Sequence, residues 1–421
     1  MDHFQIRDGE LYAEDVPLSR IAQEVGTPVY VYSRATFERH ARVFKEALSG
    51  LEKSAHLAFA VKSNPNLAVL KLLSREGYGA DVVSGGELSR ALLAGMPAED
   101  IVFSGVGKTD AELVQGLDAG IGQFNIESGE EGRELAAIAA ARGQVARCAL
   151  RVNPDVDAGT HDKISTGKAD NKFGVPIDRA PELFAELSAL PGLELRGLAV
   201  HIGSQLSELT PLETAFDKLG KMLARLRAEG HTITHMDLGG GLGVPYRKGE
   251  SPPSPAEYGA MVARVTKQWG VTLMFEPGRV IAGNAGVLLT RVIRVKRGLN
   301  HPFVIVDAAM NDLARPALYG AWHDFDAVKP SGERMMANIV GPICETGDTF
   351  AMDRETDGLA SGDLAVFRTA GAYGATMASS YNSRGFVAEV MVDGADFAVV
   401  ADRILPGAIA DAERVPDFLL D

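Results

Sequence analysis

The chain has 421 residues, of which 46% are hydrophobic and 23% are charged, as in ordinary globular proteins. Its 42 basic and 56 acidic side chains give a net charge of −14, which argues against nucleic acid or an acidic membrane as partner. Two cysteines, Cys148 and Cys344, are too few for a disulfide framework, and no apolar run suggests a signal peptide or a membrane span. We therefore expect a soluble protein of the cytoplasm with two or three domains.

The first 36 residues predict a small segment of strands with one short helix. An Asp-Gly dipeptide within Ile6–Leu11 is typical of a hairpin turn. A helix over Leu18–Val25 and a strand over Pro28–Ser33 follow. Because residues 1–36 are too few to bury a core of their own, we expect them to add strands to the C-terminal domain.

Residues 37–283 alternate short apolar strands with helical segments, which predicts an α/β fold. The eight predicted strands are Leu57–Lys62, Gly79–Ser84, Asp100–Gly105, Gly122–Glu127, Arg147–Asn153, Gly197–Ile202, His235–Gly239 and Leu273–Pro277. Eight such units are the period of a (β/α)₈ TIM barrel. Active sites of this fold lie at the C-terminal ends of the strands, so side chains at those ends are expected to meet.

The helical pattern fades after residue 283. The segments Val287–Lys296, Phe303–Asp307, Leu364–Thr369 and Phe386–Val392 are β-branched or alternating, with glycine-rich turns between them. Residues 284–421 are therefore predicted to form an all-β domain, completed by residues 1–36.

Lys62 stands at the end of the first barrel strand, before turn residues. An unpaired ammonium group is costly to bury. Taken alone, Lys62 either reaches solvent over the strand end or is a desolvated amine suited to Schiff-base formation. The other residues at the barrel mouth decide between these alternatives.

A glycine run, Gly239-Gly240-Gly241-Leu-Gly243, follows the seventh strand. The backbone N–H groups of such a turn can bind a phosphate, and the alternative is a tight turn without a ligand. Phosphates in TIM barrels usually bind after strands seven and eight, which favours the first interpretation. The run is not a dinucleotide fingerprint, because Val244 stands where the third glycine is required.

Four further polar residues lie in or at the end of barrel strands. Glu276 ends the eighth strand; it is either a surface ion-pair partner or a carboxylate that keeps a pyridine ring protonated. His201 ends the sixth strand and is either a core histidine or a flat ring that stacks on a planar cofactor. Asp81, in the second strand, and Arg151, near the end of the fifth, point to the same mouth.

The C-terminal region carries other candidates. Cys344, beside Glu345 in a Gly/Pro-rich segment, is either an inert thiol or a proton-transfer group. Arg315 and Tyr319 form a surface turn and short helix, or they bind a carboxylate. Tyr373 either packs or donates its hydroxyl group to a phosphate.

A lysine, a phosphate-type turn and a pyridinium-type carboxylate at one mouth are the three parts that pyridoxal 5′-phosphate requires. Competing chemistries lack their motifs, because the chain has no His-Glu-x-x-His, no Cys-x-x-Cys and no Gly-x-Ser-x-Gly. We therefore expect an enzyme that depends on pyridoxal phosphate and uses no metal.

Seven segments spread along nearly the whole chain resemble the diaminopimelate decarboxylase family, of the alanine-racemase-like fold-type III group. They are Phe59–Asn64, His201–Gln205, Gly239–Gly243, Glu276–Arg279, Met310–Leu313, Gly341–Glu345 and Ala370–Gly374. Met310–Leu313 and the segment His161–Gly167 separate that family from the basic amino-acid decarboxylases of the same fold. The resemblance implies a carboxy-lyase that converts meso-2,6-diaminopimelate to L-lysine and CO₂, the last step of lysine biosynthesis by the diaminopimelate route.

The resemblance also implies residue roles and a homodimer with shared active sites. Lys62 would bind the cofactor covalently, Glu276 would pair with the pyridine nitrogen and His201 would stack on the ring. The cofactor-binding set is Lys62, Asp81, Arg151, His201, Ser204, Gly240, Gly241, Glu276, Pro277, Gly278, Arg279 and Tyr373. The substrate-binding set is Arg279, Arg315 and Tyr319 for the retained carboxylate, Glu345 for the distal ammonium, and Tyr373. Cys344 of the other subunit would donate the proton.

Three other functions are compatible with parts of this pattern. A decarboxylase of another basic amino acid or of a carboxylated polyamine would need an acidic distal pocket, against which Arg279 and Arg315 argue. A racemase would place a catalytic tyrosine opposite the lysine, and the Gly-Pro-Ile-Cys-Glu segment argues against it. A catalytically inactive binding protein would be expected to lack Lys62 or Cys344, and the chain has both.

Overall fold

The computed structural model describes residues 2–53, 55–159, 161, 166–167 and 171–420. The chain divides into two compact units. The barrel unit comprises Phe37–Val244 and Ser251–Ile281, and the β unit comprises Met1–Thr36, Pro245–Glu250 and Ala282–Asp421. The three-part division at residues 36 and 283 stays a prediction, and nothing in the sequence suggested that Pro245–Glu250 belongs with the β unit.

Eight parallel strands close into a barrel, as predicted. They are β5 (His56–Ala60), β6 (Gly79–Val82), β7 (Ile101–Phe103), β8 (Gln123–Ile126), β9 (Ala146–Asn153), β11 (Leu193–Ala199), β12 (His235–Asp237) and β13 (Thr272–Phe275). Closure is made by β13 and β5, where Met274 pairs with His56 and Phe275 with Leu57. A short strand, β10 (Val175–Pro176), also pairs with β9.

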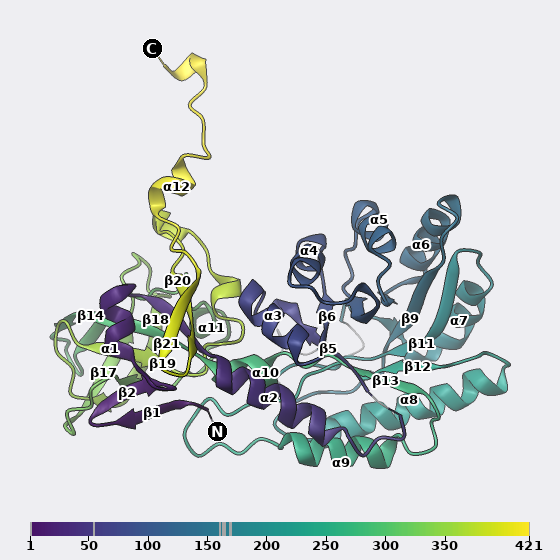
Figure 1. Cartoon of the computed structure of the whole chain (residues 1–421), viewed down its shortest axis with the longest axis horizontal. Helices are drawn as coiled ribbons and strands as arrows, with labels where there is room; N and C mark the ends of the chain where they lie inside the picture. The colour runs from purple at the N-terminus through teal and green to yellow at the C-terminus, as the bar shows by residue number, and fades with distance from the viewer. Residues whose placement is uncertain (1, 54, 160, 162–165, 168–170, 421) are drawn as a thin grey trace. The chain divides into compact units, whose positions relative to one another are not determined.

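Helices surround these strands (Figure 1). They are α2 (Arg34–Ala47), α3 (Leu67–Arg75), α4 (Gly85–Leu93), α5 (Asp110–Ala119), α6 (Gly129–Ala141), α7 (Ala180–Ser188), α8 (Thr210–Ala228), α9 (Pro255–Val265) and the short α10 (Arg279–Ala282), with 3₁₀ turns η1 (Val61–Ser63), η2 (Ala98–Asp100) and η4 (Ile177–Arg179). Side-chain caps set several helix starts: Ser84 and Ser128 accept from backbone N–H groups, and Thr109 and Ser254 complete capping boxes. The loops before α4, α5 and α6 are therefore short and end in fixed caps.

The β unit contains two sheets. Strands β1 (Phe4–Arg7), β2 (Glu10–Ala13) and β3 (Val16–Pro17) form the first, with the predicted hairpin between Arg7 and Glu10. The second contains β4 (Val29–Ser33), β14 (Gly286–Lys296), β15 (Phe303–Val306), β16 (Phe325–Ala327), β17 (Arg334–Val340), β18 (Thr349–Asp357), β19 (Leu364–Phe367), β20 (Ala388–Asp393) and β21 (Asp396–Ala401). Its helices are α1 (Leu18–Glu24), α11 (Arg315–Tyr319) and α12 (Pro406–Ala410), with 3₁₀ turns η5 (Gly283–Ala285), η6 (Ala375–Met377), η7 (Tyr381–Ser383) and η8 (Asp417–Leu419).

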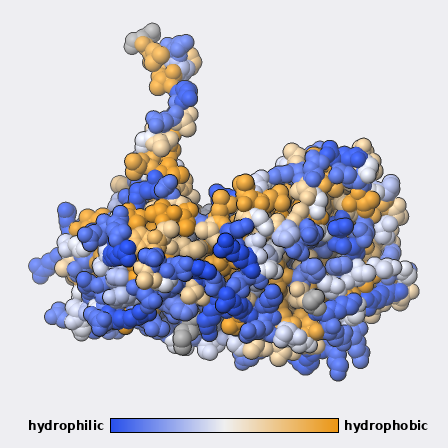
Figure 2. All heavy atoms as spheres, in the orientation of Figure 1, coloured by the Kyte–Doolittle hydropathy of each residue, from blue (hydrophilic) through white to orange (hydrophobic). Residues whose placement is uncertain are grey.

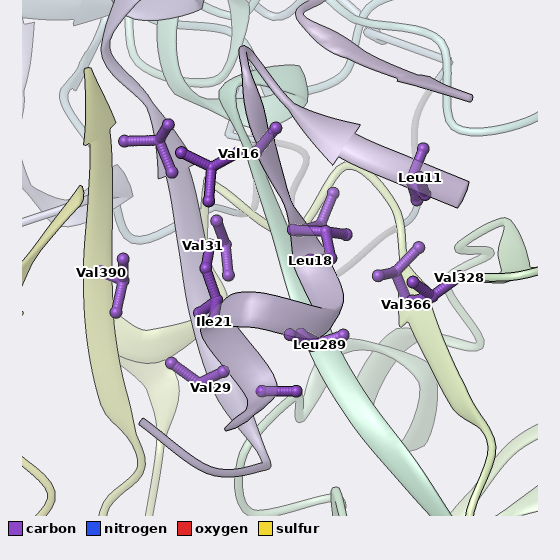
Figure 3. Close-up of a cluster of buried hydrophobic side chains, with 14 of the residues drawn as sticks. Leu11, Val16, Leu18, Ile21, Val29, Val31, Leu289, Val328, Val366 and Val390 are labelled. Atoms are coloured by element: carbon purple, nitrogen blue, oxygen red, sulfur yellow. The ribbon is translucent and has the colours of Figure 1, made fainter. Parts of the chain in front are cut away.

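The N-terminal segment completes the β unit, as predicted. Strand β4 lies between β14, to which it is antiparallel, and β20, to which it is parallel. Side chains from both ends of the chain form one buried cluster (Figure 3), including Ile21, Val31, Leu289 and Val390. Full burial of a valine, leucine or isoleucine side chain contributes roughly 1.5–3 kcal/mol to the free energy of folding. The cluster therefore holds residues 1–36 firmly against the C-terminal strands.

The residues after β21 expose apolar side chains. Val415, Phe418, Leu419 and Leu420 are each more than 60% exposed, and Figure 2 shows apolar surface along this C-terminal segment. Among the described residues, no helix is long and apolar enough to cross a membrane.

Candidate active site

Lys62 is held at the barrel mouth by a buried carboxylate. Strand β5 ends at Ala60, and the 3₁₀ turn η1 carries Lys62 just beyond it. Lys62 Nζ donates to Asp81 Oδ2 at 2.5 Å; the Asp81 side chain is fully buried, whereas that of Lys62 is 35% exposed. Within the described part of the chain, Asp81 Oδ1 is buried without a hydrogen-bond partner. This pairing favours a positioned amine over a lysine that only reaches for solvent.

A cavity of about 370 Å³ opens at this end of the barrel. Its lining includes four predicted site residues, Lys62, Arg151, His201 and Glu276. Among the polar lining residues that the sequence analysis did not select are Ser104, Asn125 and Asp237. The volume lies in the range of pockets that hold cofactors and small ligands.

Glu276 follows β13 and is buried. Its backbone N–H donates to Gly239 O at 2.8 Å, which ties the end of the eighth strand to the glycine turn of the seventh. Glu276 Oε1 accepts from Asn125 Nδ2 and Ser104 Oγ, both at 3.4 Å. Burial and the nearby carboxyls of Asp237 and Asp81 raise the pKa of Glu276 well above its usual value, and Lys62 opposes that rise.

Asp237 is the second acid of this cluster. Its Oδ2 accepts from Asn125 Nδ2 and its Oδ1 from Gly239 N–H, both at 2.9 Å. Burial also raises the pKa of Asp237. Two adjacent buried carboxyls do not both ionise readily, so a cationic ring nitrogen is the group that would stabilise the ionised form of Glu276.

His201 presents a neutral ring to the cavity. Its Nδ1 accepts a hydrogen bond from Gly240 N–H at 3.2 Å, so the ring proton is on Nε2. Burial, together with the charges of Arg151 and Lys62, lowers the pKa of His201 well below its usual value. An uncharged imidazole in a cavity wall suits contact with a flat aromatic ring.

Arg151 is anchored by a residue that the sequence analysis did not select. Arg151 Nη1 donates to Glu127 Oε1 at 2.6 Å, and both side chains are buried. The Arg151 guanidinium also lies over Phe173, 4.9 Å from the ring centroid. Glu127 in turn accepts from the backbone N–H of Gly105 and Gly174, so the cation has a fixed position.

The glycine turn after β12 admits no side chains. Gly239 and Gly241 have positive φ angles of 65° and 111°. A Cβ atom at Gly240 would clash with the carbonyl oxygen of Glu276, and one at Gly241 would clash with Gly203 O. Because the N–H group of Gly240 is engaged with His201, Gly241 is the better candidate of the two for a phosphate contact.

The residues after the eighth strand form contacts within the barrel unit. Pro277 O accepts from Ala60 N–H at 3.1 Å, so the eighth strand is tied to the first. A Cβ at Gly278 would lie 3.0 Å from that of Ala60. Arg279 is buried, and its Nη2 donates to Ser204 Oγ at 3.0 Å, which brings two predicted site residues together.

The remaining predicted site residues lie in the β unit. Arg315 begins α11 and is buried, whereas Tyr319, the last residue of that helix, is half-buried. Cys344 and Glu345 are exposed in the loop between β17 and β18. Tyr373 is half-buried, with a positive φ of 55°. Their contact with the barrel cavity stays a prediction.

The loop that carries Cys344 is fixed by a buried acid. Asp348 accepts from the backbone N–H of Ile343 and of Met310, both at 2.6 Å. Glu345 shares a hydrogen bond with Tyr381, which raises the pKa of the Tyr381 phenol. Cys344 therefore projects from a defined loop.

The lysine, the buried carboxyl group and the side-chain-free turn fit pyridoxal phosphate, and the relatives of this chain agree. Residues 34–283 match the family described as "Pyridoxal-dependent decarboxylase, pyridoxal binding domain". The diaminopimelate decarboxylase of Zymomonas mobilis is 52% identical over 402 residues, which cover 95% of this chain and 96% of that protein. The chain belongs to the diaminopimelate decarboxylase family.

Solved structures of the diaminopimelate decarboxylase family share the fold over nearly the whole chain. The Helicobacter pylori structure, complexed with L-lysine, has a TM-score of 0.90 and 38% identity, covering 94% of this chain and 98% of that one. The structure from M. jannaschii in co-complex with L-lysine has a TM-score of 0.94 and 34% identity, covering 99% of each chain. The predicted fold, family and dependence on pyridoxal phosphate are therefore confirmed. Most of the segment His161–Gly167, which also carried the resemblance, lies outside the described residues.

Gly241→Ala tests whether the turn of this diaminopimelate decarboxylase family member binds the cofactor phosphate. An alanine there combines a strained positive φ with a clash at Gly203 O, and moving the turn relieves both. We expect the dissociation constant for pyridoxal phosphate, measured by titrating the apoprotein, to rise about 5- to 150-fold, which corresponds to about 1–3 kcal/mol of strain. Gly230→Ala is the matched control, because Gly230 also has a positive φ, but its Cβ would meet no atom within 4 Å. Equal affinities in the two variants would contradict a phosphate role for this turn.

Proposed function

We propose that this protein decarboxylates meso-2,6-diaminopimelate to L-lysine and CO₂ with pyridoxal phosphate, as the last step of lysine biosynthesis by the diaminopimelate route. The observation that carries this proposal is the Lys62–Asp81 pair in a cavity that Glu276 and His201 also line. The 52% identity to a diaminopimelate decarboxylase supports the same substrate.

Barrel residues would hold the cofactor. Bound pyridoxal phosphate supplies a protonated ring that accepts the electron pair left at Cα when CO₂ departs. Lys62 would supply the amine that binds the aldehyde carbon, and Asp81 would orient that amine. Glu276 would accept a hydrogen bond from the protonated ring nitrogen, and His201 would contact the ring face. Gly241, with Gly240, Ser204, Tyr373 and the backbone of Glu276 to Arg279, is proposed to bind the phosphate, and Arg151 to complete the pocket wall.

The substrate would be fixed at its far end. Arg279, Arg315 and Tyr319 are proposed to bind the carboxylate that is retained, Glu345 is proposed to receive the distal ammonium group, and Tyr373 to contact the substrate as well. Holding that end in place would orient the bond to the leaving carboxylate for cleavage. This is catalysis by positioning, which can lower the activation free energy of a well-oriented reaction by on the order of 7–11 kcal/mol at best.

The proposed active unit is a homodimer in the cytoplasm. Cys344 of the partner subunit would protonate the carbon that has lost CO₂, through its Sγ atom. Support comes from the exposure of Cys344 and from the exposed apolar side chains of the C-terminal segment, a feature typical of surfaces that a partner covers.

The decisive experiment is a substrate comparison on the purified holoprotein. We expect a visible absorption band from lysine-bound cofactor, and equal amounts of CO₂ and L-lysine from meso-diaminopimelate. Ornithine, arginine and a carboxylated polyamine should give less than about one hundredth of that kcat/KM, since they leave the arginine-lined end of the site unmatched. If any of these amines were turned over faster than meso-diaminopimelate, that amine would become the proposed substrate instead. A protein that stays colourless and inactive after pyridoxal phosphate is added would refute the proposal.

A further inference from the structure

Arg315 is held by two residues that the proposed function does not use. The Arg315 side chain is buried, with a relative exposure of 6%. Its Nη1 donates to His323 Nε2 at 2.8 Å. Its guanidinium carbon lies 4.4 Å from the ring centroid of Tyr246. One neighbour therefore contacts the guanidinium through an N–H group, and the other through its aromatic face.

The tautomer of His323 follows from its other ring nitrogen. His323 Nδ1 lies 2.8 Å from the backbone oxygen of Arg368, which can only accept. Nδ1 therefore carries the ring proton, and Nε2 presents a lone pair to Arg315. The ring is buried and meets Tyr246 edge-on, with centroids 5.2 Å apart. His323 is thus a neutral acceptor with a locked orientation.

Tyr246 is equally well anchored. It lies in Pro245–Glu250, the segment that continues the chain from the glycine turn and belongs to the β unit. The backbone N–H groups of Tyr246 and Arg247 donate to Glu250 Oε2 at 2.9 and 3.1 Å. The backbone N–H of Lys248 donates to Asp324 Oδ2 at 2.9 Å, next to His323 in the sequence. The segment is therefore fixed against the residues that surround Arg315.

We infer that His323 and Tyr246 are positioning residues that orient Arg315 for the retained carboxylate of the substrate, an inference that rests on the proposed role of Arg315. A guanidinium has five N–H donors in one plane, and fixing one of them together with one face sets the direction of the others. A carboxylate at position 323 would also hold Arg315, but it would neutralise the charge and compete with the substrate. A neutral imidazole orients the cation and preserves its charge.

The test compares His323→Phe with His323→Gln in the holoprotein. Phenylalanine removes the acceptor, so KM for meso-diaminopimelate should rise on the order of 10- to 100-fold, the weight of a hydrogen bond to a charged group. The visible cofactor band should be unchanged, because the ring site is not altered, whereas kcat should fall as KM rises, because the same contact orients the leaving carboxylate. Glutamine offers an amide oxygen as acceptor and should restore most of the loss. Equal defects in both variants would overturn the inference.

A binding measurement separates positioning from a structural role. L-lysine keeps the carboxylate that Arg315 is proposed to bind, and cadaverine, the corresponding diamine, lacks it. In His323→Phe, the dissociation constant of L-lysine should rise in parallel with KM, and that of cadaverine should not change. Equal weakening of both ligands would indicate general damage and overturn the inference.

Two further variants complete the design. If His323→Phe does not fold, Tyr246→Leu should weaken L-lysine but not cadaverine, and failure to do so would overturn the inference. Arg315→Gln tests the underlying role: unchanged L-lysine binding there would refute the proposed function of Arg315 itself. Weak binding in Arg315→Gln with wild-type binding in His323→Phe would leave that function standing and overturn only the inference.

Discussion

Lys62→Ala is expected to abolish both the visible cofactor band and catalysis, with a fall in kcat on the order of 10⁴-fold or more, as for removal of other covalent catalysts. Alanine removes the amine that is proposed to bind the aldehyde carbon. It also leaves Asp81 buried without the cation of this ion pair, because Lys62 Nζ contacts Asp81 Oδ2. The measurement is an absorption spectrum together with CO₂ release.

Lys62→Arg separates the covalent role from the ionic one. Arginine keeps a positive charge for Asp81, but it stays protonated and cannot form a Schiff base. We expect a protein that is more stable than Lys62→Ala and equally inactive. Lys221→Ala, at an exposed position on α8, is the matched control and should behave as wild type. Substantial turnover in Lys62→Arg would contradict the covalent role.

The sequence predicted the barrel well because most barrel strands are short, largely apolar runs between helical segments. All eight strands were found, with ends misplaced by a few residues. Lys62 illustrates the error: it was assigned to the strand, whereas β5 ends at Ala60 and Lys62 lies in a 3₁₀ turn. The position at the mouth was still correct, because the turn immediately follows the strand.

Five strands of the β unit were missed, namely β3, β16, β17, β18 and β21. Strands β18 and β21 lie at the two ends of the sheet path, and their burial alternates poorly. End strands keep polar and exposed residues on both faces, such as Met352 at 58% exposure, so the period-two signal is weak. β16 has only three residues, too few for a pattern.

The missed site residues share a physical cause. Asp237, Asn125 and Ser104 line the cavity but act on Glu276 through hydrogen bonds between strands that are distant in sequence. His323 and Tyr246 contact Arg315 from segments far apart in the chain. Residues that carry chemistry leave local motifs, whereas residues that orient them are recognised only in three dimensions. Asp237 had one local signal, as the acid immediately before the glycine turn.

Cys344→Ala is expected to lower kcat by roughly 10²–10⁴-fold, the usual weight of a general acid, and to leave the cofactor band intact. The kcat of Cys344→Ser should lie between that of the wild type and that of Cys344→Ala, because serine can still hydrogen-bond but is a weaker acid than cysteine. A thiol reagent offers an independent measurement. Cys344 is exposed, whereas burial raises the pKa of Cys148 and makes that thiol inert. Alkylation should label Cys344 before Cys148, and the enzyme should lose activity at the same rate as Cys344 is labelled. Bound L-lysine should slow both processes.

The sharing of Cys344 between subunits is tested by mixing two inactive variants. In a heterodimer of Lys62→Ala and Cys344→Ala, one of the two shared sites contains both the intact Lys62 and the intact Cys344, and the other contains neither. Random reassociation of equal amounts makes half of the dimers mixed, so about a quarter of wild-type activity should return. If each site were built from a single chain, mixing would restore nothing, and the proposed exchange of Cys344 between subunits would be wrong. The visible cofactor band serves as the control for folding. The Cys344→Ala chains should keep the band whether or not activity returns, so a lost band would indicate misfolding.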